Sequence, residues 1–229
     1  MNRRSLLGSV GIAASAGLAG CTSRLFDDAP DGVVLDPQED QLADSDALAY
    51  PAYGEPLPEF ALEDPIAGVT IDTAELDRTA LFTAFFAFCP AECGILLNQL
   101  VGVQGLVAEA GLTDDVGFYP ITFDPERDDA ETLRENADTV GADLDAGNWH
   151  YLRPETAAEA KEIVQERLGM GFERETESDR VEGYDFAHVV VTLLVNPDGN
   201  VERAYRGEDF DRNRVADDVR AVVEAFDAR

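Results

Sequence analysis

The chain has 229 residues, and its 47 acidic side chains against 17 basic ones give a formal net charge of −30. Because so few cations are present to neutralise phosphate groups, this composition argues against recognition of DNA or RNA through a basic surface. Hydrophobic residues make up 45% of the chain, which argues against wholesale disorder. We interpret the acidity as a surface adaptation like that of halophilic proteins, in which hydrated carboxylates maintain solubility.

The first twenty residues have the pattern of an export signal. Two arginines precede an uncharged, apolar stretch over 6–20, which is short for a membrane span. The Arg-Arg-Ser-Leu-Leu run at 3–7 resembles a twin-arginine signal. Leu-Ala-Gly-Cys at 18–21 resembles a lipobox, with Cys21 as the lipidated first residue of the mature protein. We therefore expect an extracytoplasmic protein held at the cell membrane by a lipid on Cys21; the alternative is an uncleaved anchor helix.

The rest of the chain divides into a tether and one domain. Residues 21–56 are rich in aspartate, proline and glycine and predict a flexible acidic tether, whereas residues 57–229 predict a folded domain. Apolar and β-branched runs predict strands over 81–88, 116–123, 149–152, 186–195 and 201–206. Amphipathic or capped segments predict helices over 94–112, 129–140, 156–168 and 211–226. This alternation indicates an α/β, thioredoxin-like fold: a mainly parallel central sheet flanked by helices, with a C-terminal β-hairpin and helix.

Two cysteines lie where the first long strand leads into a helix. Cys89 and Cys93 are separated by three residues, and i and i+4 positions share one face of a helix. Backbone N–H groups and the positive end of the helix dipole at such a junction favour thiolate over thiol. The pair can bind a metal ion together or be oxidised to a disulfide.

Two thiolates make an incomplete site for a soft cation, and the chain has only two histidines that could complete it. His188 begins an apolar run, and His150 follows a tryptophan in a short predicted strand. From the pattern alone, each of them reads more readily as a packed residue than as a ligand.

Three motifs in this order resemble the Sco/SenC family. They are Cys-Pro-Ala-Glu-Cys at 89–93 after an aromatic strand, Phe-Asp-Pro-Glu-Arg-Asp at 123–128 after the next strand, and His188 ahead of Leu-Val-Asn-Pro-Asp-Gly at 194–199. The resemblance extends from about Pro56 to the C-terminus. Members of this family are membrane-tethered, thioredoxin-fold copper proteins that serve assembly of the dinuclear copper centre of haem–copper oxidases.

The resemblance implies a function and a set of ligands. Cys89, Cys93 and His188 would bind copper, as Cu(I) and, with a further ligand, as Cu(II). The protein would be a metallochaperone whose partner is the copper-receiving subunit of a haem–copper oxidase. Asp124 matches the family's aspartate near the metal, and we expect it to support the site from outside the ligand set or to order its loop.

This sequence also departs from the family pattern. Ala91 replaces a usual aspartate, Gly94 a common proline and Ala87 a common threonine. None of these changes removes a ligand, but they leave open how the site is tuned and which partner it recognises.

Other functions remain open on the sequence. Cys89 and Cys93 could instead serve as the catalytic dithiol of a thiol–disulfide oxidoreductase, which has little need of His188. A peroxiredoxin-like enzyme requires Thr or Ser at the position of Phe86, and a structural lipoprotein would hold an inert disulfide. The charged connection over 171–187 is long for a loop, and we expect it to be mobile without metal and ordered when His188 completes the site.

Overall fold

The computed structural model describes residues 30–90, 92–175 and 185–229. The expected export signal, the expected lipidation site Cys21 and Ala91 lie outside these ranges. No helix in the described ranges combines the length and apolar character needed to cross a membrane. The strands are β1 (Ala61–Asp64), β2 (Val69–Asp72), β3 (Thr79–Phe85), β4 (Val116–Thr122), β5 (Phe172–Glu175), β6 (Asp185–His188), β7 (Val191–Val195) and β8 (Val201–Arg206). The α-helices are α1 (Glu92–Glu109), α2 (Ala130–Val140), α3 (Ala157–Ala160) and α4 (Arg212–Asp227), with short 3-10 turns at Ser45–Ala47, Thr73–Glu75 and Thr113–Asp115.

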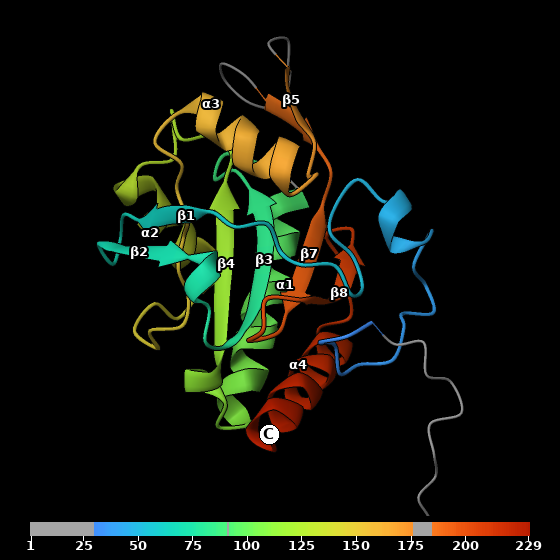
Figure 1. Ribbon diagram of the computed structural model, residues 1–229. Coiled ribbons are helices and arrows are strands. Elements are labelled where there is room, and N and C mark those ends of the chain that lie inside the picture. Colours follow the sequence, from blue (N-terminus) through green and yellow to red (C-terminus); the bar gives the residue numbers. More distant parts are fainter. Residues whose placement is uncertain (1–29, 91, 176–184) are drawn as a thin grey trace, which may run out of the picture.

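A four-stranded sheet in the order β4-β3-β7-β8 forms the centre of the molecule (Figure 1). The β3–β4 pair is parallel, but β3–β7 and β7–β8 are antiparallel. The predicted α/β class is correct, whereas the prediction of a mainly parallel sheet is wrong for these strands. The chain reverses in the β5–β6 hairpin before it enters β7, and a repeating strand–helix pattern does not reveal that reversal.

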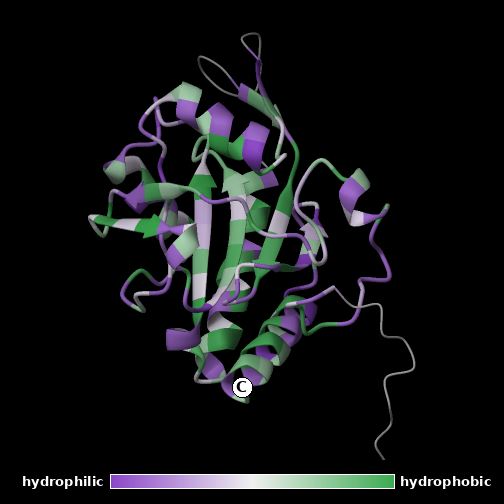
Figure 2. Ribbon diagram, in the orientation of Figure 1, coloured by the Kyte–Doolittle hydropathy of each residue, from purple (hydrophilic) through white to green (hydrophobic). Residues whose placement is uncertain are grey.

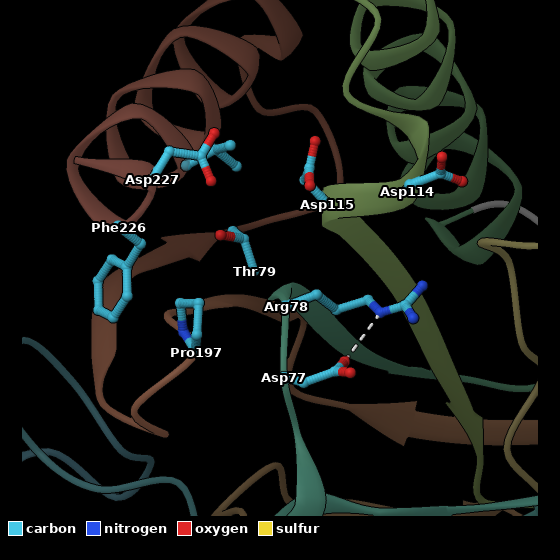
Figure 3. Close-up of a pocket in the computed structure, with 9 residues that line it drawn as sticks. Asp77, Arg78, Thr79, Asp114, Asp115, Pro197, Phe226 and Asp227 are labelled. Atoms are coloured by element: carbon cyan, nitrogen blue, oxygen red, sulfur yellow. Dashed lines mark hydrogen bonds and ion pairs between the residues drawn. The ribbon is translucent and has the colours of Figure 1, made fainter. Parts of the chain in front are cut away.

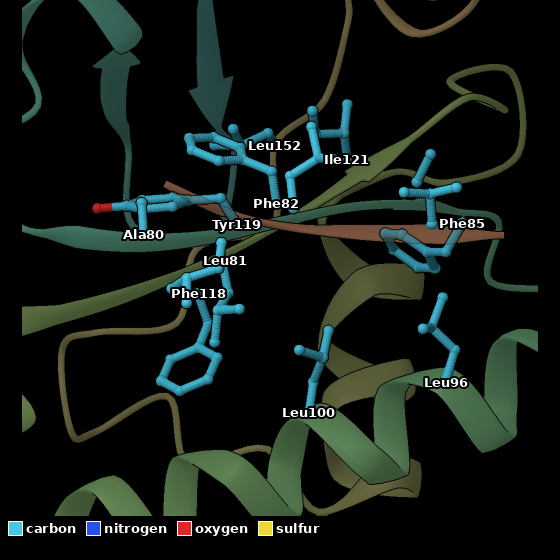
Figure 4. Close-up of a cluster of buried hydrophobic side chains, with 14 of the residues drawn as sticks. Ala80, Leu81, Phe82, Phe85, Leu96, Leu100, Phe118, Tyr119, Ile121 and Leu152 are labelled. Carbon is cyan, nitrogen blue, oxygen red and sulfur yellow. The ribbon is translucent and has the colours of Figure 1, made fainter. Parts of the chain in front are cut away.

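Both faces of the sheet are covered, so nearly all residues of its strands are buried. All seven residues of β3 and all seven of β4 are buried. Leu81 and Phe118 point toward α1, which presents Leu96 and Leu100 to the sheet (Figure 4). On the other face Phe82 stacks on Tyr119, and Phe60 meets Phe82 edge-on. The hydropathy colouring shows the same arrangement, with the apolar residues concentrated in the sheet (Figure 2).

One predicted strand is two strands in the structure. The run over 186–195 divides into β6 and β7, which belong to different sheets. Val189 donates its N–H to Gly171 and Val190 accepts one from Gly207, so the chain changes partners there. Apolar side chains continue through the break, which hides it in the sequence. The expected strand over 149–152 is reduced to two parallel bridges, in which Trp149 pairs with Phe118 and Leu152 with Ile121.

The connection over 171–187 is also more regular than its sequence indicates. Its ends form the antiparallel strands β5 and β6, with Phe172 paired to His188. Charged, exposed residues dominate β5, so no apolar period marks it. Phe172 instead stacks on Phe123, with ring centroids 4.7 Å apart. Residues 176–184 lie outside the described ranges, and the expected mobility stays a prediction.

The sequence predicts a flexible tether over residues 21–56, but residues 30–56 pack along the domain in the structure. Ala52 and Tyr53 are buried, and the buried carboxylate of Glu202 accepts N–H bonds from Val34 and Leu35. Aspartates and prolines in turns make this segment look like coil, but its few apolar residues pack. We call residues 30–56 the N-terminal strap.

The helix predicted over 156–168 is capped at its start by Thr156 and is followed by Gly169. The Thr156 hydroxyl accepts the N–H of Glu159, and α3 continues as a π-helical segment, Lys161–Arg167. Gly169 has a φ of +64°, and a Cβ there would lie 1.6 Å from the carbonyl oxygen of Ala49. Only glycine therefore allows the helix end and the N-terminal strap to approach so closely.

Leu100 tests the packing between α1 and the sheet. Its side chain is fully buried, so Leu100→Ala should lower the free energy of unfolding by about 2–5 kcal/mol through lost contacts and a residual cavity. The control Leu42→Ala removes a leucine that is 68% exposed and should change stability by less than about 0.5 kcal/mol. Denaturant unfolding measures both; equal effects would contradict the packing described.

Candidate metal centre

The two cysteines lie at the end of β3, where the buried strand gives way to α1. The predicted strand–helix junction is present, but β3 ends at Phe85 rather than Phe88 and α1 begins at Glu92 rather than Gly94. The backbone N–H of Cys93 donates to the sulfur of Cys89 across 3.3 Å, and the Cys89 thiol lies 3.7 Å from a carboxylate oxygen of Glu92. The helix terminus therefore holds the two side chains against each other.

Cys93 differs from its expected state. Its side chain is only 1% exposed, and burial, followed by its interaction with Cys89, raises the pKa of the Cys93 thiol well above the ordinary value. Desolvation thus outweighs the helix terminus at this position, contrary to the general preference for thiolate predicted above. Cys89 is partly exposed, so its thiol is accessible to solvent whereas that of Cys93 is not.

His188 reaches the cysteines from the end of β6, 95 residues further along the chain than Cys93. Its Nε2 atom lies 3.5 Å from the sulfur of Cys93. Phe86 contacts the imidazole edge-on and Phe123 packs at a tilt, with ring centroids 6.1 and 5.2 Å away. Phe186, two residues earlier in β6, packs on both of these phenylalanines. The three aromatic rings fix where the imidazole lies.

These three side chains form a group with the dimensions of a metal site. One donor atom from each of Cys89, Cys93 and His188 lies within 4.8 Å of the other two. Sulfur and nitrogen ligands at about 2.0–2.3 Å from one ion lie at most about 4.6 Å apart, so small side-chain rotations would suffice for binding. Nδ1 of His188 is buried and has no hydrogen-bond partner among the described residues. The donors and the space they enclose fit a soft metal ion.

His150 lies elsewhere and is a packed residue. Its Nδ1 atom is 3.0 Å from a carboxylate oxygen of the buried Asp64. Its ring stacks on Tyr119 at 5.7 Å. It belongs to no metal-like group in the described chain, in agreement with the interpretation of its sequence pattern.

Asp124 orders the loop that follows β4. Its carboxylate is 1% exposed and forms an ion pair with Arg127, and its carbonyl accepts N–H bonds from Arg127 and Asp128. The Arg127 guanidinium in turn lies 5.0 Å from the ring centre of Phe88, the neighbour of Cys89. We call residues 86–90, which carry Cys89, the cysteine loop. Asp124 contacts this loop through Arg127, which fits the expected loop-ordering role.

Asp128 is a residue whose role the sequence analysis missed. Its Oδ2 atom accepts the N–H of Ala87, two residues before Cys89, and the hydroxyl of Thr122. This carboxylate ties the cysteine loop to the end of β4. Burial, partly offset by the bond from Thr122, raises its pKa to about 7. Its place in the same 123–128 motif was the signal available in the sequence.

Another hollow lies at the opposite end of the sheet (Figure 3). It encloses about 300 Å³ between the start of β3 and the end of α4, and aspartates make up much of its lining, together with an ion pair between Asp77 and Arg78. It contains no cysteine or histidine. Among the described residues, the cysteine–histidine group that could hold a metal ion lies at the other end of the sheet.

A family model, SCO1/SenC, matches residues 58–224, most of the chain. The chain belongs to this family. Its match spans the cysteine pair, the 123–128 motif and His188, which confirms the resemblance inferred from those motifs. No curated protein matches the sequence.

Solved structures of Sco proteins share the fold. A SCO1/SenC family lipoprotein from Bacillus anthracis is 17% identical with a TM-score of 0.61, and the alignment covers 73% of this chain and 94% of that one. Arabidopsis thaliana ScoI with copper bound is 22% identical with a TM-score of 0.59, over 75% and 98%. BsSco, described with a disulfide switch and as a member of the Sco family of cytochrome c oxidase assembly proteins, is 21% identical with a TM-score of 0.60, over 74% and 94%. The predicted thioredoxin-like fold is thereby confirmed.

The raised pKa of Asp128 predicts a pH dependence of stability. Between about pH 4 and 7 its carboxyl is protonated in the folded protein and ionised in the unfolded one, so the stability it contributes is complete below pH 4 and is lost as the pH approaches 7. The unfolding free energy of the wild type, relative to that of Asp128→Asn, should fall by a few kcal/mol over this interval, at about 1.4 kcal/mol for each pH unit.

Denaturant unfolding at several pH values measures this difference. Asp124, which raises the Asp128 pKa, and Arg127, which lowers it, are present in both proteins. The comparison therefore isolates the carboxyl group at position 128. Parallel stability profiles for the two proteins would contradict the assignment.

Proposed function

We propose that this protein binds copper through Cys89, Cys93 and His188 and delivers it to the dinuclear copper centre of a haem–copper oxidase during assembly. The observation that carries the proposal is the convergence of two sulfurs and an imidazole nitrogen within 4.8 Å at the end of β3. Two soft donors and one borderline donor suit Cu(I), and Cu(II) becomes accessible when a further ligand joins. The copper-bound Arabidopsis structure is a relative with the same fold.

Copper is the cargo of this function, and the site is arranged to release it. Three protein ligands leave one side of the ion open, so a donor group of the acceptor can enter before a protein ligand leaves. Cys93 is buried, whereas Cys89 and His188 are partly exposed. Ligand exchange with the acceptor therefore begins on the side of Cys89 and His188, and Cys93 is the last protein ligand to dissociate from the copper.

Family membership and the N-terminal sequence support a proposal for the acceptor and the location. BsSco belongs to a family of cytochrome c oxidase assembly proteins, which supports the copper-receiving subunit of such an oxidase as the partner. The relative from Bacillus anthracis is a lipoprotein, which supports an anchor at Cys21. We propose export by the twin-arginine route and attachment to the outer face of the cell membrane.

Copper binding can be measured after anaerobic reconstitution with Cu(I). The wild type should retain one copper per chain, and Cys89→Ser, Cys93→Ser and His188→Ala should each lose most of it, because each removes one of the converging donors. Metal analysis after gel filtration gives the stoichiometry.

His150→Gln and Cys21→Ser are the matched controls, since they remove the other histidine and the other cysteine. Both should retain copper. Equal retention by His188→Ala and the wild type would refute the three-ligand site.

The cysteine pair also supports a second function, thiol–disulfide exchange. The N–H bond from Cys93 to the Cys89 sulfur keeps the two thiols adjacent, and Cys89 is the accessible one. Its thiolate would attack a target disulfide, and Cys93 would then resolve the mixed disulfide. The target gains two electrons and becomes a dithiol while Cys89 and Cys93 form a disulfide. The disulfide switch described for BsSco is consistent with this chemistry.

His188→Ala separates the two functions, because disulfide exchange requires no imidazole ligand. The variant should lose copper but reduce a small disulfide substrate within about twofold of the wild-type rate, measured by release of a chromogenic thiol. A parallel loss of both activities would show that His188 serves the dithiol as well. Cys93→Ser should leave a trapped mixed disulfide at Cys89.

A further inference from the structure

We propose that the groove beside His188 binds a basic side chain of the copper acceptor, while exposed apolar residues around the three ligands hold the segment that carries it. This proposal deepens the function proposed above and rests on it. The occupant is a segment with a soft metal-binding residue, an apolar side chain and an arginine or lysine close together. Two independent features of the surface carry the inference.

The first feature is a groove of about 570 Å³ that opens next to the imidazole. Its lining comes from the start of α1, from the β6–β7 connection and from the turn after β8: Glu92, Phe186, Ala187, His188, Val190, Gly207 and Glu208. The two charged groups in this lining are both carboxylates. The volume lies within the range of small ligand sites and accommodates a long side chain.

Glu208 is the more informative of the two carboxylates. It is half-buried, and within the described ranges it forms no hydrogen bond or ion pair. Gly207, with a φ of +82°, donates its N–H to the carbonyl of Val190 and so fixes the turn that presents Glu208 to the groove. The Glu208 carboxylate is fixed in position and partly desolvated, and it has no cationic partner among the described residues. It can therefore bind a cationic side chain, because charge-assisted hydrogen bonds are strong where water is partly excluded.

The second feature is the placement of exposed apolar side chains. Five large ones occur among the described residues, and three of them flank the ligands in sequence: Phe88 precedes Cys89, Ile95 follows Cys93 by two positions, and Val189 follows His188. Each is 44–46% exposed. In a chain with this excess of acid, such residues around one site indicate a contact surface.

Charge selects the occupant. A second copy of this chain would bring another net charge of −30 against the carboxylates of the groove. A basic segment is attracted by the same field, which accelerates encounter and orients it. The groove, rather than the overall charge, then determines which basic segment is held.

Peptide binding to the apo protein tests this site without copper. The probe is a short fluorescent peptide with one leucine, one serine in place of the metal-binding cysteine and one arginine; its partner probe has glutamate in place of arginine. Glu208→Gln should weaken binding of the arginine peptide about tenfold, as expected for loss of one charge-assisted hydrogen bond. The control Glu109→Gln removes the same charge at the far end of α1, about 25 Å away, and should have little effect.

The apolar feature has its own matched pair. Val189→Ser should weaken binding several-fold, whereas Val69→Ser, at a valine of similar exposure on β2, should not. Equal losses for Glu208→Gln and Glu109→Gln would overturn the groove, because overall charge would then explain the attraction. Self-association of the wild type that Val189→Ser abolishes would also overturn it, by assigning the surface to a second copy.

The two proposals fail separately. A wild type that retains copper but shows no Glu208-dependent preference for the arginine peptide refutes the groove alone. A wild type that shows the preference but retains no copper refutes the metallochaperone function alone.

Discussion

The contact of Phe86 with its aromatic neighbours is the interaction on which the rest of the site depends. Phe86 is fully buried just after β3, and its ring meets Phe123 from the end of β4 and Phe186 from β6. Three chain segments that are remote in sequence are thereby fixed at one end of the sheet. The imidazole of His188 packs on the same rings, which holds it 3.5 Å from the Cys93 sulfur. A metal centre assembled from distant residues needs such a rigid apolar base.

Buried polar groups also fix the loop that carries Cys89. Asp128 joins the cysteine loop to β4 through Ala87 and Thr122, and Asp124 holds Arg127 against the ring of Phe88. Both carboxylates are buried, so their hydrogen bonds are made where water does not compete. The same motif that marks the family thus supports the loop that carries Cys89. Burial of Cys93 and partial exposure of Cys89 then give the two thiols different access to solvent.

Local patterns predicted much of this structure. The β3–α1 junction, the helix starts near Asp129 and Thr156 and the closing helix all follow from signals within a few residues, because short-range sterics and hydrogen bonds determine them. The break between β6 and β7, the β5–β6 hairpin and the packing of the N-terminal strap depend on partners far away in sequence. His188 illustrates the difference: its own neighbours indicate a packed residue, and only the ordered family motifs indicated its role.

The N-terminal strap has a consequence for orientation at the membrane. Asn196, in the turn between β7 and β8, donates its side-chain amide to the carbonyl of Gly32 at 2.8 Å, so the strap starts at the end of the sheet away from Cys89. Nine Cα–Cα steps lead from Cys21 to Pro30, two residues before Gly32, a span of at most about 32 Å. With the lipid proposed at Cys21, the tether would join the domain at the end of the sheet away from the proposed ligands. When that end faces the bilayer, the length of β3, about 23 Å, separates the proposed ligands from it.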